Sequence, residues 1–471
     1  MSTQCTSTQL EFPEVGRRRL VASFDGGTIT SNAGALLLRA VEKCTDVCRR
    51  ASQCFQDYRD PSLVEHTVED LVTQRVMAVA LGYEDLNDHD TLRRDPLVAA
   101  AVGKADPTGE NRVRPADRGA ALAGKSTLNR LELVGSKEAK ADRYKKVTYD
   151  EAALDALLVD VFIESQPTPP ARIVLDVDAT DDPLHGQQEG RFFHGYYRHY
   201  CYLPLYIFCG AHVLCARVRP SNIDGAAGAV DEVARIVERV RQAWPSVSIV
   251  VRGDSGFCRD ELLNWCEVHA VEYVIGLAKN ERLTNHIAPE LAQAQAQCQQ
   301  TGVAARVFAD FRYRTRKSWS RERRVVGKAE HLPAGANPRF VVTSLPPAIL
   351  GAQALYEDLY CARGDMENRI KEQQLALFAD RTSCATLRAN QLRLYWATLA
   401  YVLLQQLRDR GLAGTRLARA QCDTLRLRLL KIGARVRITA RRIWVALSEL
   451  TPDTDLFIAA AQRLRATSGP A

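Results

Sequence analysis

The stretch Arg172-Ile-Val-Leu-Asp-Val-Asp-Ala-Thr-Asp-Asp-Pro-Leu-His-Gly186 decides the fold that we expect. Its residues alternate between two faces, one with Ile173, Leu175 and Val177 and the other with Val174, Asp176 and Asp178. This pattern, closed by Asp-Asp-Pro, is typical of a buried β-strand that carries acids toward its C-terminal end. Because an ionised carboxylate is costly to bury without a cation or donors, the strand indicates a metal site or reacting centre at its rim. The alternative is that these acids only form a turn or cap a helix.

The size and composition are those of a globular protein with several domains. The chain has 471 residues, of which 46% are hydrophobic and 25% charged, enough for roughly two to four domains. No apolar run approaches the roughly 20 residues of a membrane span, and Met1–Glu14 does not resemble a secretion signal. We therefore expect a cytoplasmic protein that does not interact with membranes.

The cysteines favour a reducing compartment. There are 13 of them, an odd number, scattered singly along the chain rather than arranged as a disulfide framework. Cys44, Cys48 and Cys54 lie closest together, but their spacing matches no zinc pattern, which makes a metal site there the weaker interpretation.

The positive charge of the chain is concentrated near its C-terminus. The formal net charge is +7, and residues 381–442 hold 13 Arg and Lys431 against Asp409 and Asp423, a balance of +12. The rest of the chain is therefore net acidic. An arginine-rich segment of this kind suits binding to a phosphate backbone, and a solvated basic surface is the alternative.

Residues 1–165 are expected to be mainly helical. Apolar residues recur at helical spacing in Ala33–Cys48, Val68–Leu81 and Tyr149–Ile163. Such a region is a plausible DNA-binding module, although helices alone do not show this.

A phosphate-loop pattern lies inside this region. Gly119-Ala-Ala-Leu-Ala-Gly-Lys-Ser126 matches G-x-x-x-x-G-K-[ST] in full. A phosphate loop must follow a buried apolar strand, whereas the preceding residues 111–118 are mostly polar or charged and contain Pro115. We therefore expect no nucleotide cofactor, and we expect Lys125 and Ser126 to begin a helix.

The segment 171–280 has a clear order of elements. The first strand is followed by apolar runs at 202–210 and 213–218, an amphipathic helix at 226–244, a strand at 248–254 that ends in Asp254, a helix at 259–269 and a strand at 273–278. Three strands, a helix, a strand, a helix and a strand describe a mixed sheet flanked by helices, the order of the ribonuclease H-like fold. In that order the first and fourth strands are neighbours, which would place Asp178 beside Asp254.

Residues 281–345 interrupt this order. Short strands are expected at 305–313, 321–327 and 340–344, within basic loops that contain Lys317, Trp319, Arg321, Arg323 and Arg324. This segment would be a β insertion whose hairpins touch DNA, or else a purely structural elaboration.

The segment 348–376 is expected to be a helix that carries a further acid. Tyr360, Arg363, Glu367 and Lys371 fall at i, i+3, i+7 and i+11 and share one stripe. A surface ladder of ion pairs is the ordinary interpretation of this spacing. Beside a sheet with two Asp at its rim, however, Glu367 would supply the third carboxylate of a two-metal site.

Several motifs together resemble the DDE transposases of bacterial insertion sequences. They are Phe24-Asp-Gly-Gly, Ser31-Asn-Ala-Gly34, Ala80-Leu-Gly-Tyr-Glu-Asp-Leu-Asn-Asp-His-Asp90, Ala123-Gly-Lys-Ser-Thr-Leu-Asn-Arg130, Asp176-Val-Asp-Ala-Thr-Asp-Asp-Pro-Leu-His-Gly186, Arg252-Gly-Asp-Ser-Gly-Phe257 and Tyr360-Cys-Ala-Arg-Gly-Asp-Met-Glu-Asn-Arg-Ile-Lys371. The chain is most similar to the group of insertion sequence thirteen-eighty, which is related to the group of insertion sequence four. The resemblance covers nearly the whole chain.

The resemblance implies which residues act. The catalytic and metal-binding triad falls on Asp178, Asp254 and Glu367, with Asp176 as the alternative to Asp178. Tyr360 and Arg363 match the Tyr-x2-Arg-x3-Glu signature and would contact a phosphate or a displaced base. The distal Lys of that signature is Gln374 here, and whether Lys371 replaces it stays open. Trp319 and Lys371 complete the residues expected at DNA.

The resemblance also implies the chemistry. Mg²⁺, with Mn²⁺ as an alternative, would be held by Asp178, Asp254 and Glu367 and would support phosphodiester cleavage and transfer. The partners would be double-stranded DNA at terminal inverted repeats and at the target, and a second copy of the chain in a homodimer that pairs the two ends. Such a protein would act in the bacterial cytoplasm at the nucleoid. Hairpin intermediates occur in related enzymes, and the sequence does not decide that pathway.

We expect five regions along the chain. They are a helical N-terminal DNA-binding region at 1–165, the first part of the catalytic domain at 166–280, the β insertion at 281–345, the second part of the catalytic domain at 346–400 and a basic region at 401–471. Two alternatives remain, a nuclease of the same fold without strand transfer and an inactive or domesticated transposase that only binds DNA. The presence of all three acids speaks against the second.

Overall fold

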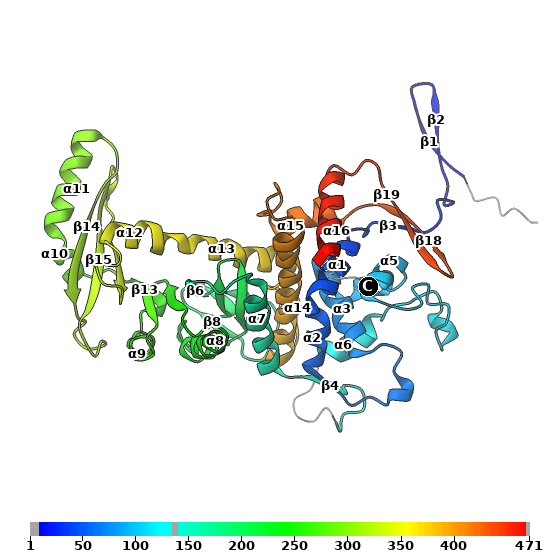
Figure 1. The fold of residues 1–471 in the computed structure, drawn as a ribbon, viewed down its shortest axis with the longest axis horizontal. Coiled ribbons are helices and arrows are strands. Elements are labelled where there is room, and N and C mark those ends of the chain that lie inside the picture. Colours follow the sequence, from blue (N-terminus) through cyan, green and yellow to red (C-terminus); the bar gives the residue numbers. More distant parts are fainter. Residues whose placement is uncertain (1–8, 134–139, 468–471) are drawn as a thin grey trace, which may run out of the picture. The chain divides into compact units, whose positions relative to one another are not determined.

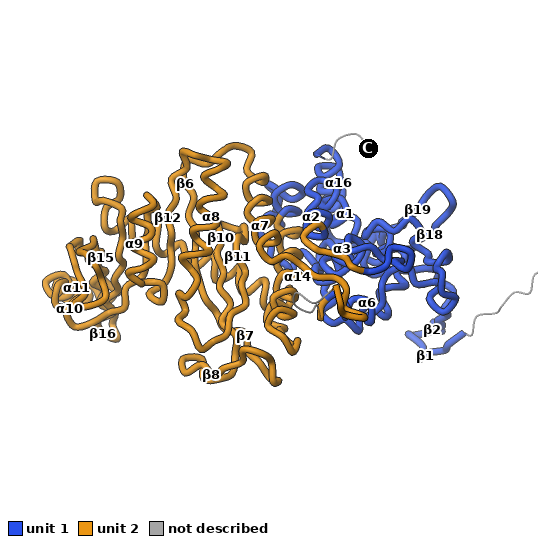
Figure 2. Tube along the Cα trace, turned by 90° about the horizontal axis from the view of Figure 1, so that it is seen from below, with its two compact units in different colours: residues 1–52, 59–131, 406–471 blue, residues 53–58, 132–405 orange. Residues whose placement is uncertain are grey.

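The computed structural model describes residues 9–133 and 140–467. The chain forms two compact units, shown in different colours in Figure 2. Unit 1 contains Met1–Ser52, Arg59–Leu131 and Gln406–Ala471, and unit 2 contains Gln53–Tyr58 and Glu132–Gln405. The fold is mixed α/β, and none of the described helices combines the length and apolar character needed to cross a membrane.

Unit 2 is built on one mixed sheet with nine strands (Figure 1). Its path is β11-β10-β6-β12-β13-β17-β15-β14, with β16 paired to β15. The strands are β6 (Arg172–Ala179), β10 (Leu205–Cys209), β11 (His212–Arg217), β12 (Ser248–Gly253), β13 (Glu272–Leu277), β14 (Ala305–Tyr313), β15 (Arg323–Leu332), β16 (Gly335–Ala336) and β17 (Arg339–Thr343).

The first and fourth strands of the sequence order are neighbours, as predicted. β6 and β12 run parallel, and Gly253 lies opposite Val177 in their register. The residues that follow these positions, Asp178 and Asp254, therefore emerge at the same edge of the sheet. β12 also pairs in parallel with β13, whereas β10 pairs antiparallel with β6.

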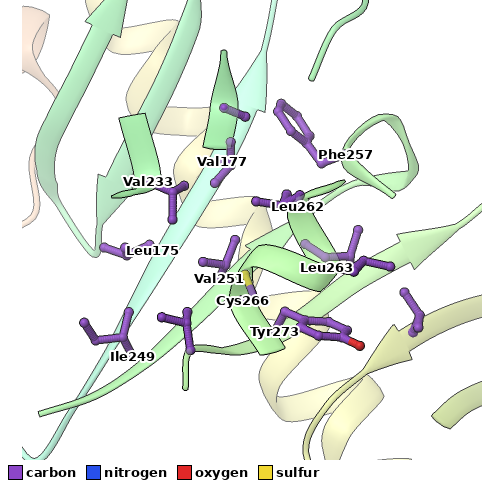
Figure 3. Packing of buried hydrophobic residues seen from close by; sticks show 14 of the residues in the cluster. Leu175, Val177, Val233, Ile249, Val251, Phe257, Leu262, Leu263, Cys266 and Tyr273 are labelled. Atoms are coloured by element: carbon purple, nitrogen blue, oxygen red, sulfur yellow. The ribbon is translucent and has the colours of Figure 1, made fainter. Parts of the chain in front are cut away.

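Helices cover one face of this sheet. They are α7 (Glu151–Ser165), α8 (Ala229–Ala243) and α9 (Asp260–Val268). The predicted amphipathic face of α8 is confirmed, because Val233, Ile236, Val237 and Val240 are all buried. These side chains pack against Ile173, Leu175 and Val177 of β6 in one apolar core, part of which Figure 3 shows. Burying one such side chain contributes about 1.5–3 kcal/mol, so this face holds the strands in place.

The opposite face carries the acids and lies against other helical segments. Val174 of β6 packs into a smaller core with Val250, Val274, Leu355 and Tyr356. The last two belong to a long irregular helical segment made of α12 (Ala352–Ala354), the π-helical turn η5 (Leu355–Tyr360), the 3₁₀ turn η6 (Cys361–Arg363), α13 (Gly364–Lys371) and the π-helical turn η7 (Glu372–Ala376). α14 (Leu387–Gln406) also packs on this face, where Tyr401 contacts Phe208 of β10 edge to face.

The segment expected as an insertion continues the main sheet. β17 pairs antiparallel with β13, and β15 and β14 follow it outward. α10 (Glu281–His286) and α11 (Ala288–Thr301) precede these strands, and α11 lies along β14 and β15 (Figure 1). The three predicted strands exist, but they extend the sheet and are not a separate body. Their pairing is nonlocal, and local sequence patterns carry no information on it.

Two small sheets complete unit 2. β4 (Phe55–Asp57) pairs with β5 (Val147–Tyr149). The other small sheet has the order β7-β9-β8, with β7 (Asp182–Pro183), β8 (Phe192–His194) and β9 (His199–Tyr202). β7 follows β6 after a two-residue turn, which places this small sheet close to the acids at the end of β6.

Unit 1 is mainly helical, and its elements come from both ends of the chain. The helices are α1 (Ala35–Thr45), α2 (Val47–Gln53), α3 (Val68–Ala80), α4 (His89–Leu92), α5 (Pro96–Val102), α6 (Lys125–Glu132), α15 (Cys422–Leu425) and α16 (Thr454–Thr467). Shorter turns are η1 (Pro61–Leu63), η2 (Leu86–Asp88), η3 (Pro115–Asp117), η8 (Leu407–Gly411) and η9 (Arg426–Leu430). The helix predicted at 68–81 is confirmed as α3, whereas the one predicted at 33–48 ends at Thr45, where Asp46 has a left-handed backbone conformation, and α2 begins at Val47.

The phosphate-loop pattern falls where a helix begins. α6 starts at Lys125, as predicted, and only the turn η3 lies between Gly103 and Gly124, so no strand precedes it. The Lys125 backbone N–H donates to Asp90 Oδ1 at 3.2 Å, and its ammonium group lies 3.2 Å from Asp90 Oδ2. Both contacts of Lys125 therefore go to the Asp90 carboxylate.

Unit 1 also contains strands that the sequence pattern did not predict. β1 (Leu10–Val15) and β2 (Arg18–Ala22) form an exposed hairpin. β18 (Ala434–Thr439) and β19 (Arg442–Leu447) form a second hairpin, which pairs with β3 (Ile29–Thr30). The 381–442 segment is thus not a run of basic helices throughout.

Much of the basic charge of residues 381–442 is used inside the protein. Arg388 lies 3.0 Å from Glu151 and Arg393 lies 3.3 Å from Glu132. Arg416 and Arg428 both pair with the buried Asp453. Four further arginines, Arg435, Arg437, Arg441 and Arg442, are exposed on the β18–β19 hairpin.

Candidate active site

Two strands and one helical segment bring the predicted acids together. Asp178 lies near the end of β6 and Asp254 directly follows β12. Glu367 lies on α13, which is anchored by the buried Met366 and Ile370. The charges of Asp254 and Glu367 both act on the Asp178 carboxyl, so the three acids share one neighbourhood.

The two acids of β6 have different environments. Asp176 is buried, and both of its carboxylate oxygens accept hydrogen bonds from the Arg252 guanidinium, Nη2 to Oδ2 at 2.7 Å. Arg252 also donates to the Leu359 carbonyl of the helical segment. This bidentate pair ties β6, β12 and the helix together and leaves Asp176 without a free oxygen.

Asp178 is the acid of this strand that faces the other two. Its Oδ1 accepts from the Ala179 backbone N–H at 3.0 Å, and its Oδ2 lies 3.6 Å from Arg363 Nη1. Burial raises the pKa of the Asp178 carboxyl to about 6, the Arg363 guanidinium opposes this shift, and the charges of Asp254 and Glu367 add to it. Such a group favours a cation nearby, because a cation stabilises its charged form.

Asp254 also shapes the chain around it. Its Oδ1 accepts from the Gly256 backbone N–H at 2.8 Å and so caps the turn η4 (Ser255–Phe257). The neighbouring Gly276 of β13 must be small, because a Cβ there would lie 2.6 Å from the Tyr360 hydroxyl and 2.9 Å from the Ser255 nitrogen. The Tyr360 hydroxyl therefore lies close to Gly276, beside the backbone of Asp254 and Ser255.

Arg363 and Glu367 lie on the same face of the helical segment, as their spacing predicts. Arg363 Nη2 donates to Glu367 Oε1 at 2.8 Å, while its Nη1 faces Asp178. The segment is not a regular helix, since π-helical turns lie on both sides of α13. Such turns are frequent at functional sites because they rotate the residues that follow them.

The arrangement is not a preformed metal site. Within the residues that the structure describes, no group of three or more His, Cys, Asp or Glu side chains is close enough to hold a metal ion. Arg363 lies between Asp178 and Glu367 and compensates part of their charge. A cation could replace the guanidinium there if Arg363 turned aside.

Lys371 and Gln374, which follow Glu367 in the sequence, have different surroundings. Lys371 is exposed at the end of α13, one turn beyond Glu367. Gln374 points elsewhere, and its amide nitrogen donates to Asp182 Oδ1 at 2.9 Å and to the Asp181 carbonyl at 3.1 Å. Burial raises the pKa of Asp182 to about 8, against the effect of the Gln374 hydrogen bond.

The Trp319 side chain is buried and so is not exposed for a contact with DNA. Only 4% of it is exposed, its ring packs edge to face on Tyr313, and the Arg323 guanidinium lies 5.4 Å from its ring centre. Arg323 itself is buried and paired with Asp260 and Glu267. These residues hold α9 against β15, and the structure does not bring Trp319 to the acids.

Sequence reasoning missed two features of this neighbourhood. The sequence prediction uses Arg252 only as part of the Arg252–Phe257 motif, although an Arg on a buried strand requires an acidic partner. The second feature is the β8–β9 hairpin, where residues 190–202 include six aromatic residues and no acid. That composition was a visible signal.

The fold and the acids define an α/β protein with three carboxylates gathered where strand ends meet a helical segment. The family model described as transposase DDE domain group 1 matches residues 12–469. The chain therefore belongs to this family of DDE transposases, the enzymes that cleave and join DNA. No curated protein matches the chain.

Proposed function

We propose that this protein is a transposase that binds terminal inverted repeats, cleaves DNA at element ends and joins them to target DNA by two-metal phosphoryl transfer. The observations that support this proposal are that Arg363 contacts both Asp178 and Glu367, and that Asp178 and Asp254 follow paired positions of two neighbouring parallel strands. The three acids come from elements far apart in the sequence, and a fold without a use for them would not be expected to gather like charges.

The catalytic unit would have the ribonuclease H-like fold. Numbered in sequence order, its first five long strands have the spatial order 3-2-1-4-5, from β11 through β10, β6 and β12 to β13. The parallel pairing of β6 with β12 sets two acids side by side at one edge. We also propose the group of insertion sequence thirteen-eighty as the subgroup, on the motifs quoted above.

The donor set suits Mg²⁺, with Mn²⁺ as an alternative. Carboxylate oxygens are the ligands that these hard cations prefer. Burial is the main cause of the raised pKa of Asp178, the charges of Asp254 and Glu367 add to it, and a bound cation would favour the charged carboxylate. Bound metal would activate the attacking oxygen and stabilise the leaving oxygen of the phosphodiester.

The residues of the chain would divide the remaining work. Asp178 would hold both ions, and Asp254 and Glu367 would hold one each. Arg363, released from Asp178 and Glu367, would pair with an oxygen of the scissile phosphate, for which its planar fork is well suited. Tyr360, held against Gly276, would contact a neighbouring phosphate or base, and Lys371 would add a positive charge one turn away.

The β18–β19 hairpin is the part of unit 1 best suited to bind duplex DNA. We call residues 434–447 the basic hairpin. In its register Arg437 lies opposite Trp444 and Arg435 opposite Ala446, so the two arginines and the indole share an exposed face. A two-stranded ribbon of this kind fits the major groove, and its arginines would neutralise phosphates.

Pairing of two element ends would require a second copy of the chain, and we propose a homodimer in that complex. Its place of action would be the bacterial cytoplasm at the nucleoid. Both statements rest on family membership.

The test is incubation of the full chain with Mg²⁺, a labelled element end and a target plasmid. We expect cleaved ends and covalent end–target joints from the natural protein, and neither product from Asp254→Asn, which keeps the capping oxygen but loses the charge. Broken ends without joints would show a nuclease. Binding without either product would show an inactive DNA-binding descendant.

A further inference from the structure

The segment 190–202 forms a hairpin with an unusual surface beside the active site. We call it the aromatic hairpin. It contains Phe192, Phe193, Tyr196, Tyr197, Tyr200 and Tyr202, together with Arg191, Arg198, His194 and His199, and it has no Asp or Glu. Tyr196 is 83% exposed and Phe193 57% exposed. Exposed aromatic side chains that gather on one element mark a binding surface.

The exposed rings are arranged as a surface and are not scattered. Phe193 and Tyr200 lie opposite each other in the register and pack edge to face with their ring centres 5.6 Å apart. The Arg191 guanidinium lies 3.7 Å from the Tyr200 ring centre. At the tip, Tyr196 packs edge to face on Tyr197 at 5.0 Å. Rings held by one another lose little freedom when a ligand binds.

The aromatic hairpin is tied to the catalytic strand at two points. β9 pairs with β7, which follows β6 after a short turn. In that turn, Asp181 Oδ2 lies 2.7 Å from His199 Nε2. Burial raises the pKa of Tyr197, and the charges of Asp181 and Asp178 add to this shift, so Tyr197 lies near both acids. The strand pairing with β7 and the contact with Asp181 hold the hairpin beside the end of β6.

We infer that the aromatic hairpin is a stacking surface for unpaired bases of the DNA strand next to the scissile phosphate. This inference rests on the proposed function, which places that phosphate at Asp178. Aromatic side chains with interleaved arginines, without acids, are what single-stranded nucleic acid requires, since rings stack on bases and cations face phosphates. Bases paired within a duplex would not offer their faces to Phe193 and Tyr196.

The experiment compares two probes that differ only in their bases. One is a mixed-sequence duplex with a five-nucleotide single-stranded tail, and the other carries the same tail with abasic sites. Because base stacking contributes about 1–3 kcal/mol per base, the natural protein should bind the normal tail at least about tenfold more tightly. Phe193→Ala with Tyr196→Ala should remove this preference. Phe193→Tyr with Tyr196→Phe, which keeps the rings, should retain it.

Equal binding of both tails by the natural protein would overturn the inference, as would an unchanged preference in a double alanine variant that melts at the natural temperature. An effect of that variant on self-association alone would also overturn it and assign the hairpin to a second copy of the chain. Asp254→Asn separates this inference from the proposed function. If that variant still cleaves while the tail preference is present, the catalytic assignment fails and the stacking surface stands.

Discussion

At the scale of single residues, the two acids of β6 do different things although they lie two positions apart. Asp176 forms a buried bidentate ion pair with Arg252. Asp178 instead lies 3.6 Å from Arg363 and is affected by the charges of Asp254 and Glu367. Removing one partner of a buried ion pair leaves an unpaired charge, which costs about 3–5 kcal/mol. Removing a charge from a crowded acidic site relieves repulsion instead. Stability and catalysis should therefore separate between these neighbours.

Arg252→Ala should lower the free energy of unfolding by about 3–5 kcal/mol, because it leaves the buried Asp176 carboxylate without its ion-pair partner. Asp178→Asn should leave stability unchanged or raise it, yet remove DNA cleavage. Denaturant unfolding and the end-cleavage assay measure the two effects. Arg239→Ala is the matched control, since its guanidinium pairs with Asp160 at the surface and should contribute less than about 1 kcal/mol. If Arg252→Ala were as mild as this control, the structural role of Asp176 would be wrong.

Asp182 gives a pH dependence of stability. Its folded pKa is about 8, against an ordinary value of 3.8, so between these limits the folded state binds a proton that the unfolded state lacks. Stability should therefore fall as pH rises, by up to about 1.4 kcal/mol per pH unit from this group. Asp182→Asn keeps an oxygen for the Gln374 amide and should flatten the fall in melting temperature between pH 5 and 8. An equal slope in variant and natural protein would refute this assignment.

Arg363 has two predicted states, one between the acids and one on the DNA phosphate. Arg363→Lys keeps the charge but loses the fork that faces Asp178 and Glu367 together. We expect it to lower the cleavage rate about 10–100-fold while duplex affinity stays within about twofold. Single-turnover cleavage and filter binding would check this. Natural rates in the lysine variant would show that only the charge of Arg363 matters.

At the scale of elements, the sheet around the acids could be predicted further than the surfaces around it. The alternation of Ile173, Leu175 and Val177 identified β6, and the order of the following elements correctly placed it beside β12. Periodicity also found α8, because its apolar face is continuous. The local apolar pattern of each of these elements is sufficient to predict it, because its apolar face packs into the same core.

Other elements depend on information that local patterns lack. The strands at 305–343 were found, but their junction with β13 is set by distant residues. The helical pattern of 348–376 does not predict the π-helical turns that lie before and after Glu367. Composition predicts DNA contacts at Trp319 and along residues 381–442. In the structure Trp319 is buried, and several arginines of 381–442, such as Arg388 and Arg416, form ion pairs with acids of the protein.

The basic hairpin should contribute to duplex binding through phosphates. Arg435→Ala with Arg437→Ala should weaken binding of any duplex and reduce the slope of log affinity against log salt by about 2, one for each lost phosphate contact. Fluorescence anisotropy across a salt series measures this slope. Arg239→Ala with Arg241→Ala removes two surface arginines from α8 and should leave it unchanged. Equal slopes for both pairs would place the DNA elsewhere.

At the scale of the whole molecule, the catalytic acids lie in unit 2 and the basic hairpin in unit 1. Unit 1 is assembled from both ends of the chain, and unit 2 lies between them in the sequence. The sequence predicted a helical N-terminal region and a basic C-terminal region as separate parts, because it cannot show that distant segments fold together.

The most direct test of the central claim replaces each acid by cysteine. Mn²⁺ accepts a thiolate ligand more readily than Mg²⁺. We predict that Asp178→Cys, Asp254→Cys and Glu367→Cys fail to cleave a labelled end in Mg²⁺ and recover at least part of this activity in Mn²⁺, whereas Asp176→Cys shows no such rescue. Full cleavage in Mg²⁺ by any of the first three variants would contradict the claim that these acids hold the catalytic metal.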